Sequence, residues 1–407
     1  MIQLPHIEFI DGNNFSGRTH YLKSITGLDP DGLNTADGVY LGSVPSNYIS
    51  GLATRVKEEF QLHSDKGASD EALNFIIQTL GLSNILHSNP FTLSGGEQAM
   101  VALINATLLR PNCVAIDTLL EQVNEQWKLP FLEMSLNGQF GDIKFLIADN
   151  RSDEIHLPIE HIKVPFDFPD EEIVERHTFH PIDHKRFSAG LYSHDAVSLS
   201  IRNLSYRYKK GPQVLEDVNI DLAPGIVYHL EGVNGAGKST LSKLLAGILK
   251  MQDNSKLLVD SVPVNLYRHP GKVVGYSFQN PDEQLFETTV EEEILPKSFS
   301  SEVEVRRRQM LLEAFGLQDV AYEHPGDMPF TIRKRIALAA TFGMDRPWYI
   351  LDEPTIGLDN DNSFSIGEII KALTNIGKSV ILISHAHFLS NILTTKTILL
   401  KGMRLHF

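Results

Sequence analysis

The feature of the sequence that most constrains the fold is a glycine-rich nonapeptide that occurs twice. Residues 232–240 read Gly-Val-Asn-Gly-Ala-Gly-Lys-Ser-Thr, and residues 12–19 hold an altered copy, Gly-Asn-Asn-Phe-Ser-Gly-Arg-Thr. The segment that follows each copy closes on a glycine at the same spacing, at Gly27 and at Gly247. Internal similarity at a fixed spacing indicates related structural units. We therefore predict a tandem of two such units, one intact and one altered.

The length of 407 residues accommodates two domains. We predict a first domain at residues 1–164, a linker at 165–195 and a second domain at 196–407, because the linker combines Pro, His and mixed charge without periodicity. Strand–helix alternation around Gly-rich turns predicts a mainly parallel α/β sheet in each domain, with a helical insertion. Two strands, Ala196–Tyr208 and Val214–Leu222, precede the loop of the second domain and have no counterpart in the first.

Composition restricts the partners of the chain. The formal net charge of −15 argues against nucleic acid, which usually binds a basic surface. A single cysteine, Cys113, excludes an internal disulfide framework and suits a reducing compartment. The sequence has no apolar run of the roughly 20 residues that a membrane span needs, and its first residues lack the regions of a signal peptide. We therefore expect a cytoplasmic protein that is able to dock on a membrane protein.

The loop of the second domain has the chemistry of a phosphate cradle. Backbone N–H groups of a Gly-rich loop that opens a helix bind anions, because the helix dipole favours negative charge there. Lys238 is predicted to reach the β- and γ-phosphates, and the Ser239 hydroxyl to bind Mg²⁺. The predicted phosphate-contacting residues are Gly232, Asn234, Gly235, Gly237, Lys238, Ser239 and Thr240. The first domain has Arg18 in place of Lys238, which keeps the charge on a bulkier, planar group.

A second motif of the same domain is an apolar strand that ends in two carboxylates. Residues 348–351 lead into Asp352 and Glu353. Asp352 is suited to hold Mg²⁺ through water, and Glu353 to polarise the attacking water molecule. The first domain carries Asp117 and Thr118 at these positions, so it has no such base.

The first domain contributes a different motif, Leu-Ser-Gly-Gly-Glu-Gln at residues 93–98, before a predicted helix at 99–109. A serine and two glycines that open a helix form another anion-binding N-terminus. Because no phosphate-loop lysine accompanies them, Ser94, Gly95, Gly96 and Glu97 are expected to meet a phosphate that is held elsewhere.

In both domains the chain resembles the ATP-binding-cassette ATPases, whose cofactors are ATP and Mg²⁺. In that family the signature motif of one cassette closes over the nucleotide of the other in a head-to-tail sandwich. The resemblance implies that Gln279 senses the γ-phosphate and Mg²⁺, and that Asp359 and His385 are the D-loop Asp and the switch His. It also implies that Tyr208 stacks on adenine. The chain would then be a monomer that contains its own pseudo-dimer.

The altered residues all belong to one of the two sites of such a sandwich. The second domain has Met-Pro-Phe-Thr-Ile at residues 328–332 where the signature belongs, and Pro329 has no N–H to donate. The first domain carries Asp149 (or Asn150) at the switch position, Asn124 at the D-loop position and Ser43 near the sensor glutamine. The sequence therefore predicts one site that hydrolyses ATP and one that is silent.

Residues 276–290 resemble the Gln-loop of the ATPases of energy-coupling-factor importers, which serve vitamins and transition-metal ions. The resemblance implies integral-membrane partners, with a coupling helix near Gln279–Val290, and a location on the cytoplasmic face of the membrane. One alternative is a soluble tandem ATPase that acts on a ribosome, nucleic acid or another enzyme. A further alternative is a regulatory or assembly ATPase whose first domain only donates its signature. The basic run Arg306–Arg308, on a predicted helix at Glu302–Phe315, is interpreted as a solvated helix face.

Overall fold

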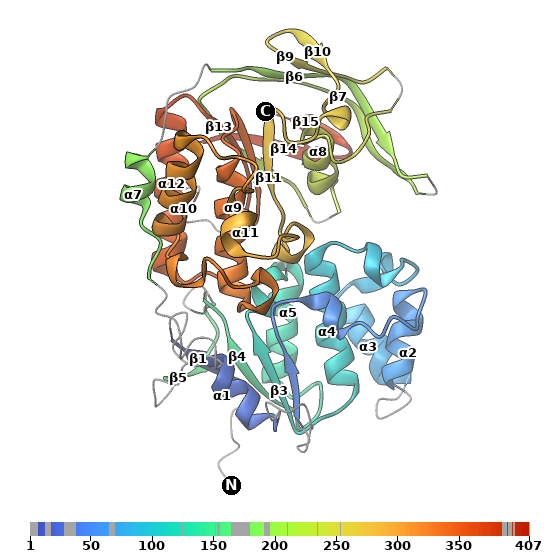
Figure 1. The fold of residues 1–407 in the computed structure, drawn as a ribbon. Coiled ribbons are helices and arrows are strands. Elements are labelled where there is room, and N and C mark those ends of the chain that lie inside the picture. The colour runs from blue at the N-terminus through green and yellow to red at the C-terminus, as the bar shows by residue number, and fades with distance from the viewer. Residues whose placement is uncertain are drawn as a thin grey trace. The chain divides into compact units, whose positions relative to one another are not determined.

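The structure is a computed structural model in which the chain forms two compact units, Met1–Arg176 and His177–Phe407. It describes residues 7–406 except for 13–17, 28–37, 65–69, 124, 151, 153–154, 164–179, 191–195, 210, 234, 253, 385–388, 390–392 and 394. Figure 1 shows the elements of both units.

The first unit is built on a five-stranded parallel sheet with the strand order β2-β3-β4-β1-β5. The strands are β1 (Ile7–Asp11), β2 (Gly38–Leu41), β3 (Cys113–Asp117), β4 (Lys144–Ala148) and β5 (Glu160–Lys163). Strands β3 and β4 are apolar and buried along almost their whole length, as expected where helices cover both faces of a parallel sheet.

Five helices and several short turns complete the described part of the first unit. The helices are α1 (Arg18–Ile25), α2 (Val56–Ser64), α3 (Asp70–Thr79), α4 (Gly95–Leu108) and α5 (Glu125–Leu136). Short 3₁₀ turns are η1 (Pro45–Tyr48), η2 (Leu82–Asn84), η3 (Pro90–Thr92) and η4 (Leu119–Gln122). Helix α4 is buried over most of its length and packs against α2 and η1.

The second unit contains two sheets. A six-stranded sheet has the order β11-β12-β13-β8-β14-β15, in which only β15 runs antiparallel to its neighbour. Its strands are β8 (Val227–Glu231), β11 (Val274–Ser277), β12 (Trp348–Asp352), β13 (Ser379–Ile383), β14 (Thr395–Lys401) and β15 (Arg404–His406). An antiparallel sheet, β10-β9-β6-β7, lies at one end of this unit (Figure 1). Its strands are β6 (Leu199–Arg207), β7 (Gln213–Leu222), β9 (Lys256–Val259) and β10 (Val262–Val264).

The helices of the second unit are α7 (His184–Ala189), α8 (Lys238–Leu245), α9 (Val290–Ile294), α10 (Glu302–Ala314), α11 (Phe330–Gly343) and α12 (Asn360–Asn375). Its 3₁₀ turns are η6 (Leu266–Arg268), η7 (Pro281–Glu283), η8 (Gln318–Val320) and η9 (Pro325–Asp327). Helices α9 and α11 are in close contact at Gly343. A Cβ atom added to Gly343 would lie only 2.1 Å from the carbonyl oxygen of Ile294. The predicted parallel strands and the helical insertion are thus present in both units.

The two units share more than the glycine-rich loop. When β1 is matched with β8, the five parallel strands of the first unit fall in the same order as β11-β12-β13-β8-β14. The insertions begin with equivalent backbone bonds: Val56 N donates to Ser88 O at 3.0 Å, and Val290 N donates to Glu323 O at 3.0 Å. The antiparallel sheet has no counterpart among the described residues of the first unit.

Part of the segment that we predicted as a linker is folded onto the second unit. Helix α7 packs against α10 and α12, and the N–H of its N-cap residue Asp183 donates to Ala314 O at 2.7 Å. The Phe187 ring is buried between Phe315 and Phe342, with ring centroids 6.2 and 5.4 Å away. Residues 180–190 therefore belong to the second unit by their contacts.

The basic run on α10 is less exposed than its sequence suggested. Arg306 is exposed and pairs with Glu302 at 2.5 Å, as a solvated face would allow. The interpretation is wrong for Arg307 and Arg308, whose side chains are drawn into the fold. The Arg308 guanidinium donates to Leu295 O at 2.8 Å, and Arg307 pairs with Asp345 at 2.8 Å.

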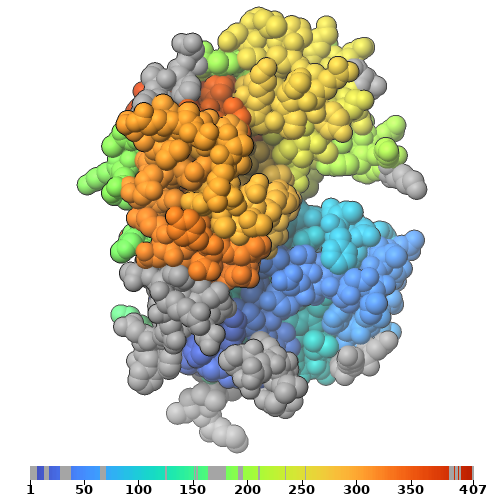
Figure 2. Space-filling view, in the orientation of Figure 1, coloured from blue at the N-terminus to red at the C-terminus, as the bar shows by residue number. Residues whose placement is uncertain are grey.

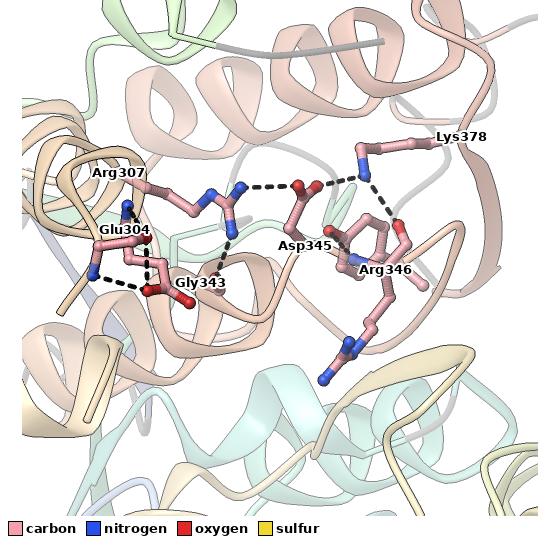
Figure 3. Close-up of polar contacts among 8 residues, drawn as sticks. Glu304, Arg307, Gly343, Asp345, Arg346 and Lys378 are labelled. Carbon is pink, nitrogen blue, oxygen red and sulfur yellow. Dashed lines mark hydrogen bonds and ion pairs between the residues drawn. The ribbon is translucent and has the colours of Figure 1, made fainter. Parts of the chain in front are cut away.

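A buried ion cluster joins α10 to the start of β13. Figure 3 shows Asp345 between Arg307 and Lys378. The Lys378 Nζ lies 2.5 Å from Asp345 Oδ1 and donates to Arg346 O at 2.9 Å, and its side chain is only 1% exposed. Burial lowers the pKa of Lys378, while the Asp345 carboxylate acts in the opposite direction. This cluster satisfies a charge that would otherwise be costly to bury.

Candidate nucleotide site

The glycine-rich loop lies between β8 and α8 and has a backbone that only glycine adopts without strain at two positions. Gly232 has φ 154°, and a Cβ atom there would lie 2.6 Å from Leu400 O. Gly237 has φ 103°, and a Cβ atom there would lie 2.9 Å from a methyl carbon of Val214. The loop is thus fixed by its neighbours β14 and β7. Asn234, another predicted phosphate contact, lies outside the described residues.

Lys238 is the first residue of α8, and its ammonium turns back into the loop. The Nζ atom donates to Gly232 O at 2.7 Å and lies 3.4 Å from Val233 O. Burial lowers the pKa of Lys238, while the charges of Glu353 and Asp352 raise it. Phosphate oxygens bound in the loop would therefore compete with these two carbonyls for the protons of Lys238. Ser239 and Thr240 follow in the first turn of α8, and Gly235 precedes it in the loop at φ 76°.

The carboxylate pair sits at the carboxyl end of β12. Tyr276 Oη donates to Asp352 Oδ2 at 3.0 Å, a contact that the sequence did not predict. Burial, and then the charge of Glu353, raise the pKa of Asp352 to about 6. Glu353 has φ 46°, and its N–H donates to Ile383 O at 2.8 Å. A left-handed backbone at a non-glycine residue costs energy, and such strain is concentrated at functional sites.

The residue types at this site fit Mg²⁺. Ser239, Gln279 and Asp352 offer a hydroxyl, an amide and a carboxylate, which are the hard oxygen donors that this ion prefers. Asp352 and Glu353 are neighbours and both are buried, so a dication would offset the repulsion that raises the pKa of Asp352. In the part of the chain that the structure describes, no three His, Cys, Asp or Glu residues group into a metal site of their own.

Gln279 follows β11, and its backbone is held by an unexpected residue. Lys334 Nζ donates to Phe278 O at 3.1 Å and to Gln279 O at 3.0 Å. Lys334 lies on α11 and is fully buried. This role could not be predicted, because Lys334 stands in a basic run, 333–335, that is typical of an exposed helix face.

Two further predicted residues, Tyr208 and Asp359, follow β6 and precede α12, respectively. The Tyr208 hydroxyl lies 3.2 Å from Thr240 Oγ1, so the ring is next to the first turn of α8. It is 44% exposed and is therefore open to a stacking partner. Asp359 is the N-cap of α12, and its Oδ1 accepts hydrogen bonds from the backbone N–H of Asn362 at 3.0 Å and from its side-chain amide at 2.7 Å. His385 lies outside the described residues.

The four signature residues lie in the first unit, at the start of α4. Glu97 accepts hydrogen bonds from the Ser94 backbone N–H at 2.9 Å and from the Ser94 hydroxyl at 2.7 Å. Gly95 and Gly96 form the first turn, where the free N–H groups of the helix point outward. The equivalent helix of the second unit, α11, begins after Pro329, which provides no side-chain cap.

Residues 13–17 of the altered loop lie outside the described residues, but Arg18 and Thr19, which end the altered copy and begin α1, bond to side chains of the same unit. Arg18, at the lysine position, is buried and donates to Asn150 Oδ1 at 2.6 Å. Thr19, at the serine position, donates to Asp117 Oδ2 at 2.5 Å, and Tyr40 donates to the same oxygen at 2.8 Å. The Tyr40–Asp117 bond is the counterpart of the Tyr276–Asp352 bond of the second unit.

The first unit repeats the backbone of the positions predicted to be catalytic and carries different side chains there. Thr118 has φ 57°, and its N–H donates to Ala148 O at 2.8 Å, which repeats the geometry of Glu353. Asp149 forms a buried ion pair with Lys128 at 3.1 Å. A threonine cannot act as a base toward water at neutral pH.

The comparisons with known proteins agree with this geometry. The family model described as "ABC transporter" matches residues 215–356. An energy-coupling factor transporter ATP-binding protein, EcfA1 of Thermotoga maritima, is 35% identical over 196 residues, which are 46% of this chain and 73% of the relative. A putative ABC transporter ATP-binding protein of Clostridium tetani is 26% identical over 351 residues, covering 76% of this chain and 80% of the relative.

One solved structure matches almost the whole chain. It is titled a model of ribosome-bound archaeal Pelota and ABCE1, and it aligns with a TM-score of 0.67 at 18% identity, covering 98% of this chain and 73% of that one. At this identity the match is a likeness of fold. None of the helices in the described ranges is long and apolar enough to span a membrane.

The glycine-rich loop, the parallel sheet and the carboxylate pair define a P-loop ATPase that binds ATP. The chain belongs to the family of ATP-binding-cassette (ABC) transporter ATP-binding proteins.

Proposed function

We propose that the chain hydrolyses ATP at a single composite site, made from the loop of the second unit and the signature residues of the first. The observation that carries this proposal is the distribution of intact and altered motifs. The first unit keeps the helix start at Ser94–Glu97 although its own loop has lost the lysine, and the second unit keeps the loop although Pro329 opens its signature helix. A head-to-tail pairing of the units puts both intact motifs into one site.

The first unit is then a degenerate ABC domain, at residues 1–164, joined through 165–195 to a competent domain at 196–407. The equal strand order of the two parallel sheets supports this interpretation, as does the repeated geometry of Thr118 and Glu353. The match of the solved structure to 98% of the chain supports a tandem fold. The altered site does not turn over, because Thr118 replaces the base.

In the competent site each residue has a defined task. Lys238 and the loop N–H groups hold the phosphates, while Gln279 and His385 contact the γ-phosphate. Ser239, Gln279 and Asp352 hold Mg²⁺, which when bound offsets the charge of the phosphate oxygens. Glu353 accepts a proton from the attacking water.

Tyr208 and Asp359 complete the site at its edges. Tyr208 stacks on the adenine ring, and its exposed ring face supports this role. Asp359 shapes the turn that leads from the carboxylate pair into α12.

We further propose that hydrolysis powers an importer of the energy-coupling-factor type, with the chain on the cytoplasmic face of the membrane. The relative from Thermotoga maritima, an energy-coupling factor transporter ATP-binding protein, supports this choice. A coupling helix of a membrane subunit would dock near Gln279–Val290. Phe286 and Tyr322 support this docking surface, because their side chains are 80% and 78% exposed. In Figure 2 the insertion of this unit, coloured orange, lies on the surface facing the viewer.

The composite site is tested by a pair of matched substitutions. Gly95→Asp places a carboxylate at the signature helix start of the first unit, where it would repel the γ-phosphate held by Lys238. Thr331→Asp places one at the altered signature of the second unit. We expect Gly95→Asp to abolish turnover and Thr331→Asp to retain most of it, with circular dichroism used to confirm that both variants are folded. Normal hydrolysis by Gly95→Asp together with a loss in Thr331→Asp would rule out the composite site.

A second candidate is a soluble tandem ATPase that acts on a ribosome, nucleic acid or another enzyme. The likeness of fold to a chain of the ribosome-bound complex favours it, and the net charge of −15 is against a nucleic-acid surface. Affinity purification from detergent-solubilised membranes distinguishes the two. Recovery of a multi-span membrane protein supports transport, and recovery of ribosomal subunits in its place supports the alternative.

A further inference from the structure

Helix α11 carries a lysine in a place where charged residues are rare. Lys334 is fully buried, and both of its hydrogen-bond partners among the described residues are backbone carbonyls, those of Phe278 and Gln279, at 3.1 and 3.0 Å. Burying an ammonium is costly unless it is paired, so a lysine here must be compensated.

The two carbonyls provide part of this compensation, and the charges of Asp352 and Glu353 add to it. Burial lowers the pKa of Lys334 to about 8, while the charges of Asp352 and Glu353 raise it. The protonated form of Lys334 is thus opposed by burial and favoured by both carboxylates. Its protons fix the backbone of the residue that we propose as a Mg²⁺ ligand.

A second residue holds the same stretch of backbone to α11. The Gln284 side chain accepts a hydrogen bond from Phe278 N at 2.9 Å and donates one to Ala337 O at 2.8 Å. Residues 278–279 are thus tied to α11 through both a carbonyl and an amide. Their position depends on this helix and not only on β11.

The first unit offers an internal comparison. Aligning the two signatures, Ser94 with Pro329, places Ala99 at the position of Lys334. Ala99 has no donor, and the same unit has Thr118 in place of the catalytic glutamate. The lysine is therefore present in the unit that keeps the base and absent from the unit that has lost it.

We propose that Lys334 is a positioning residue for ATP hydrolysis: it holds the Gln279 backbone so that the amide side chain meets the metal and the γ-phosphate. The inference rests on the proposed role of Gln279. A simpler possibility is that Lys334 only stabilises the fold, and the experiment must separate the two.

The chain contains a matched control, Lys378. This lysine is also buried and also donates to a backbone carbonyl, that of Arg346, but it belongs to the ion cluster of Figure 3, on residues to which we give no task in the site. Lys378→Met therefore reports what the loss of a buried lysine does to the fold alone. Lys334→Met removes the donors, and Lys334→Gln keeps an amide that can donate to the same carbonyls.

We expect Lys334→Met to lower kcat by about 10²-fold, because a misplacement of about 1 Å at a catalytic group has an effect of this size. KM for ATP should stay close to that of the wild type, since Lys238 and the loop are untouched. Lys334→Gln should restore most of the lost kcat. Lys378→Met should lower the melting temperature and leave kcat unchanged.

A binding measurement gives a readout that does not depend on turnover. In a Glu353→Gln background, the affinity for a fluorescent ATP analogue is measured with EDTA and with Mg²⁺. We expect Mg²⁺ to tighten binding in the parent and to have little effect once Lys334→Met is added, because Gln279 no longer meets the metal. If Lys334→Met does not fold, Gln284→Met tests the same backbone and should lower kcat at unchanged KM.

Two results would overturn the proposal: a normal kcat and a normal Mg²⁺ effect in Lys334→Met, or equal losses of kcat in Lys334→Met and Lys378→Met that follow their melting temperatures. A normal kcat in Gln284→Met would overturn it where Lys334→Met does not fold. The activity of Glu353→Gln, the parent variant, shows whether a negative result concerns the role of Lys334 or the proposed ATP hydrolysis site itself. If Glu353→Gln itself turns over normally, the catalytic site is wrong; if it is inactive while Lys334→Met is normal, only the role of Lys334 is wrong.

Discussion

Replacing Glu353 should change the activity and the stability of the protein in opposite directions. The side chain is buried, follows the buried Asp352 directly, and sits on a backbone with φ 46°. Glu353→Gln keeps the shape and removes one of two neighbouring charges. We expect turnover to fall by about 10²–10⁴-fold, the usual contribution of a general base, while the second unit becomes more stable.

The size of the stability gain follows from the environment of Asp352. Burial and the charge of Glu353 together raise the pKa of Asp352 from 3.8 to about 6. One pKa unit corresponds to about 1.4 kcal/mol, and Glu353 is the second of the two causes, so relieving its repulsion should stabilise the ATP-free unit by about 1 kcal/mol.

The gain should depend on pH in a defined direction. The folded-state pKa of Asp352 lies above its unfolded value, so the penalty for its ionisation is absent at low pH and grows as pH rises from about 4 through about 6. The variant should therefore exceed the wild type in stability at pH 8 and lose this advantage near pH 5, where Asp352 is protonated.

Urea unfolding followed by tryptophan fluorescence can measure this in one unit. The chain has two tryptophans, Trp127 in the first unit and Trp348 in the second. A Trp127→Phe background leaves Trp348 as the reporter. Retained turnover, or a variant less stable than its parent at pH 8, would refute the reasoning. Thr118→Glu, the mirror change beside Asp117, should destabilise the first unit and create no new activity.

Three further predictions follow from the structure. Lys378→Met takes away one of the two cationic partners of the partly buried Asp345, which keeps Arg307, and should lower the free energy of unfolding by about 2 kcal/mol, measured by urea denaturation. Gly343→Ala puts a Cβ atom 2.1 Å from Ile294 O and should cost about 3 kcal/mol, visible as a lower melting temperature. Chelation of Mg²⁺ by EDTA should abolish phosphate release, and Mn²⁺ should restore it, since the proposed ligands are all oxygen donors.

The sequence predicted the parts of this molecule that depend on neighbours along the chain. The loop at 232–240 was visible because its glycines are needed for a backbone with positive φ, and strand β12 because its apolar run ends at Asp352. The helix predicted at Glu302–Phe315 is confirmed as α10, Glu302–Ala314.

Contacts between distant residues could not be predicted in the same way. Tyr276 and Asp352 meet only because β11 and β12 are adjacent in the sheet. Lys334, on helix α11, bonds to the backbone of Gln279, which lies 55 residues earlier in the chain. A lysine within a basic run has the same local signature whether it is solvated or buried. Arg307 was misinterpreted for this reason.

The residues that end the two loop copies differ in how they are held, and we expect this difference to affect how much each unit gains from ATP. In the first unit Arg18 donates to Asn150 and Thr19 donates to Asp117, so these four polar side chains satisfy one another in pairs. In the second unit the raised pKa of Asp352 and the lowered pKa of Lys238 record charges that are held at a cost. A ligand that offsets both charges recovers this cost as binding energy, so ATP should stabilise the second unit more than the first. In the first unit the corresponding side chains are already satisfied by hydrogen bonds to one another, so a bound nucleotide would offset less there.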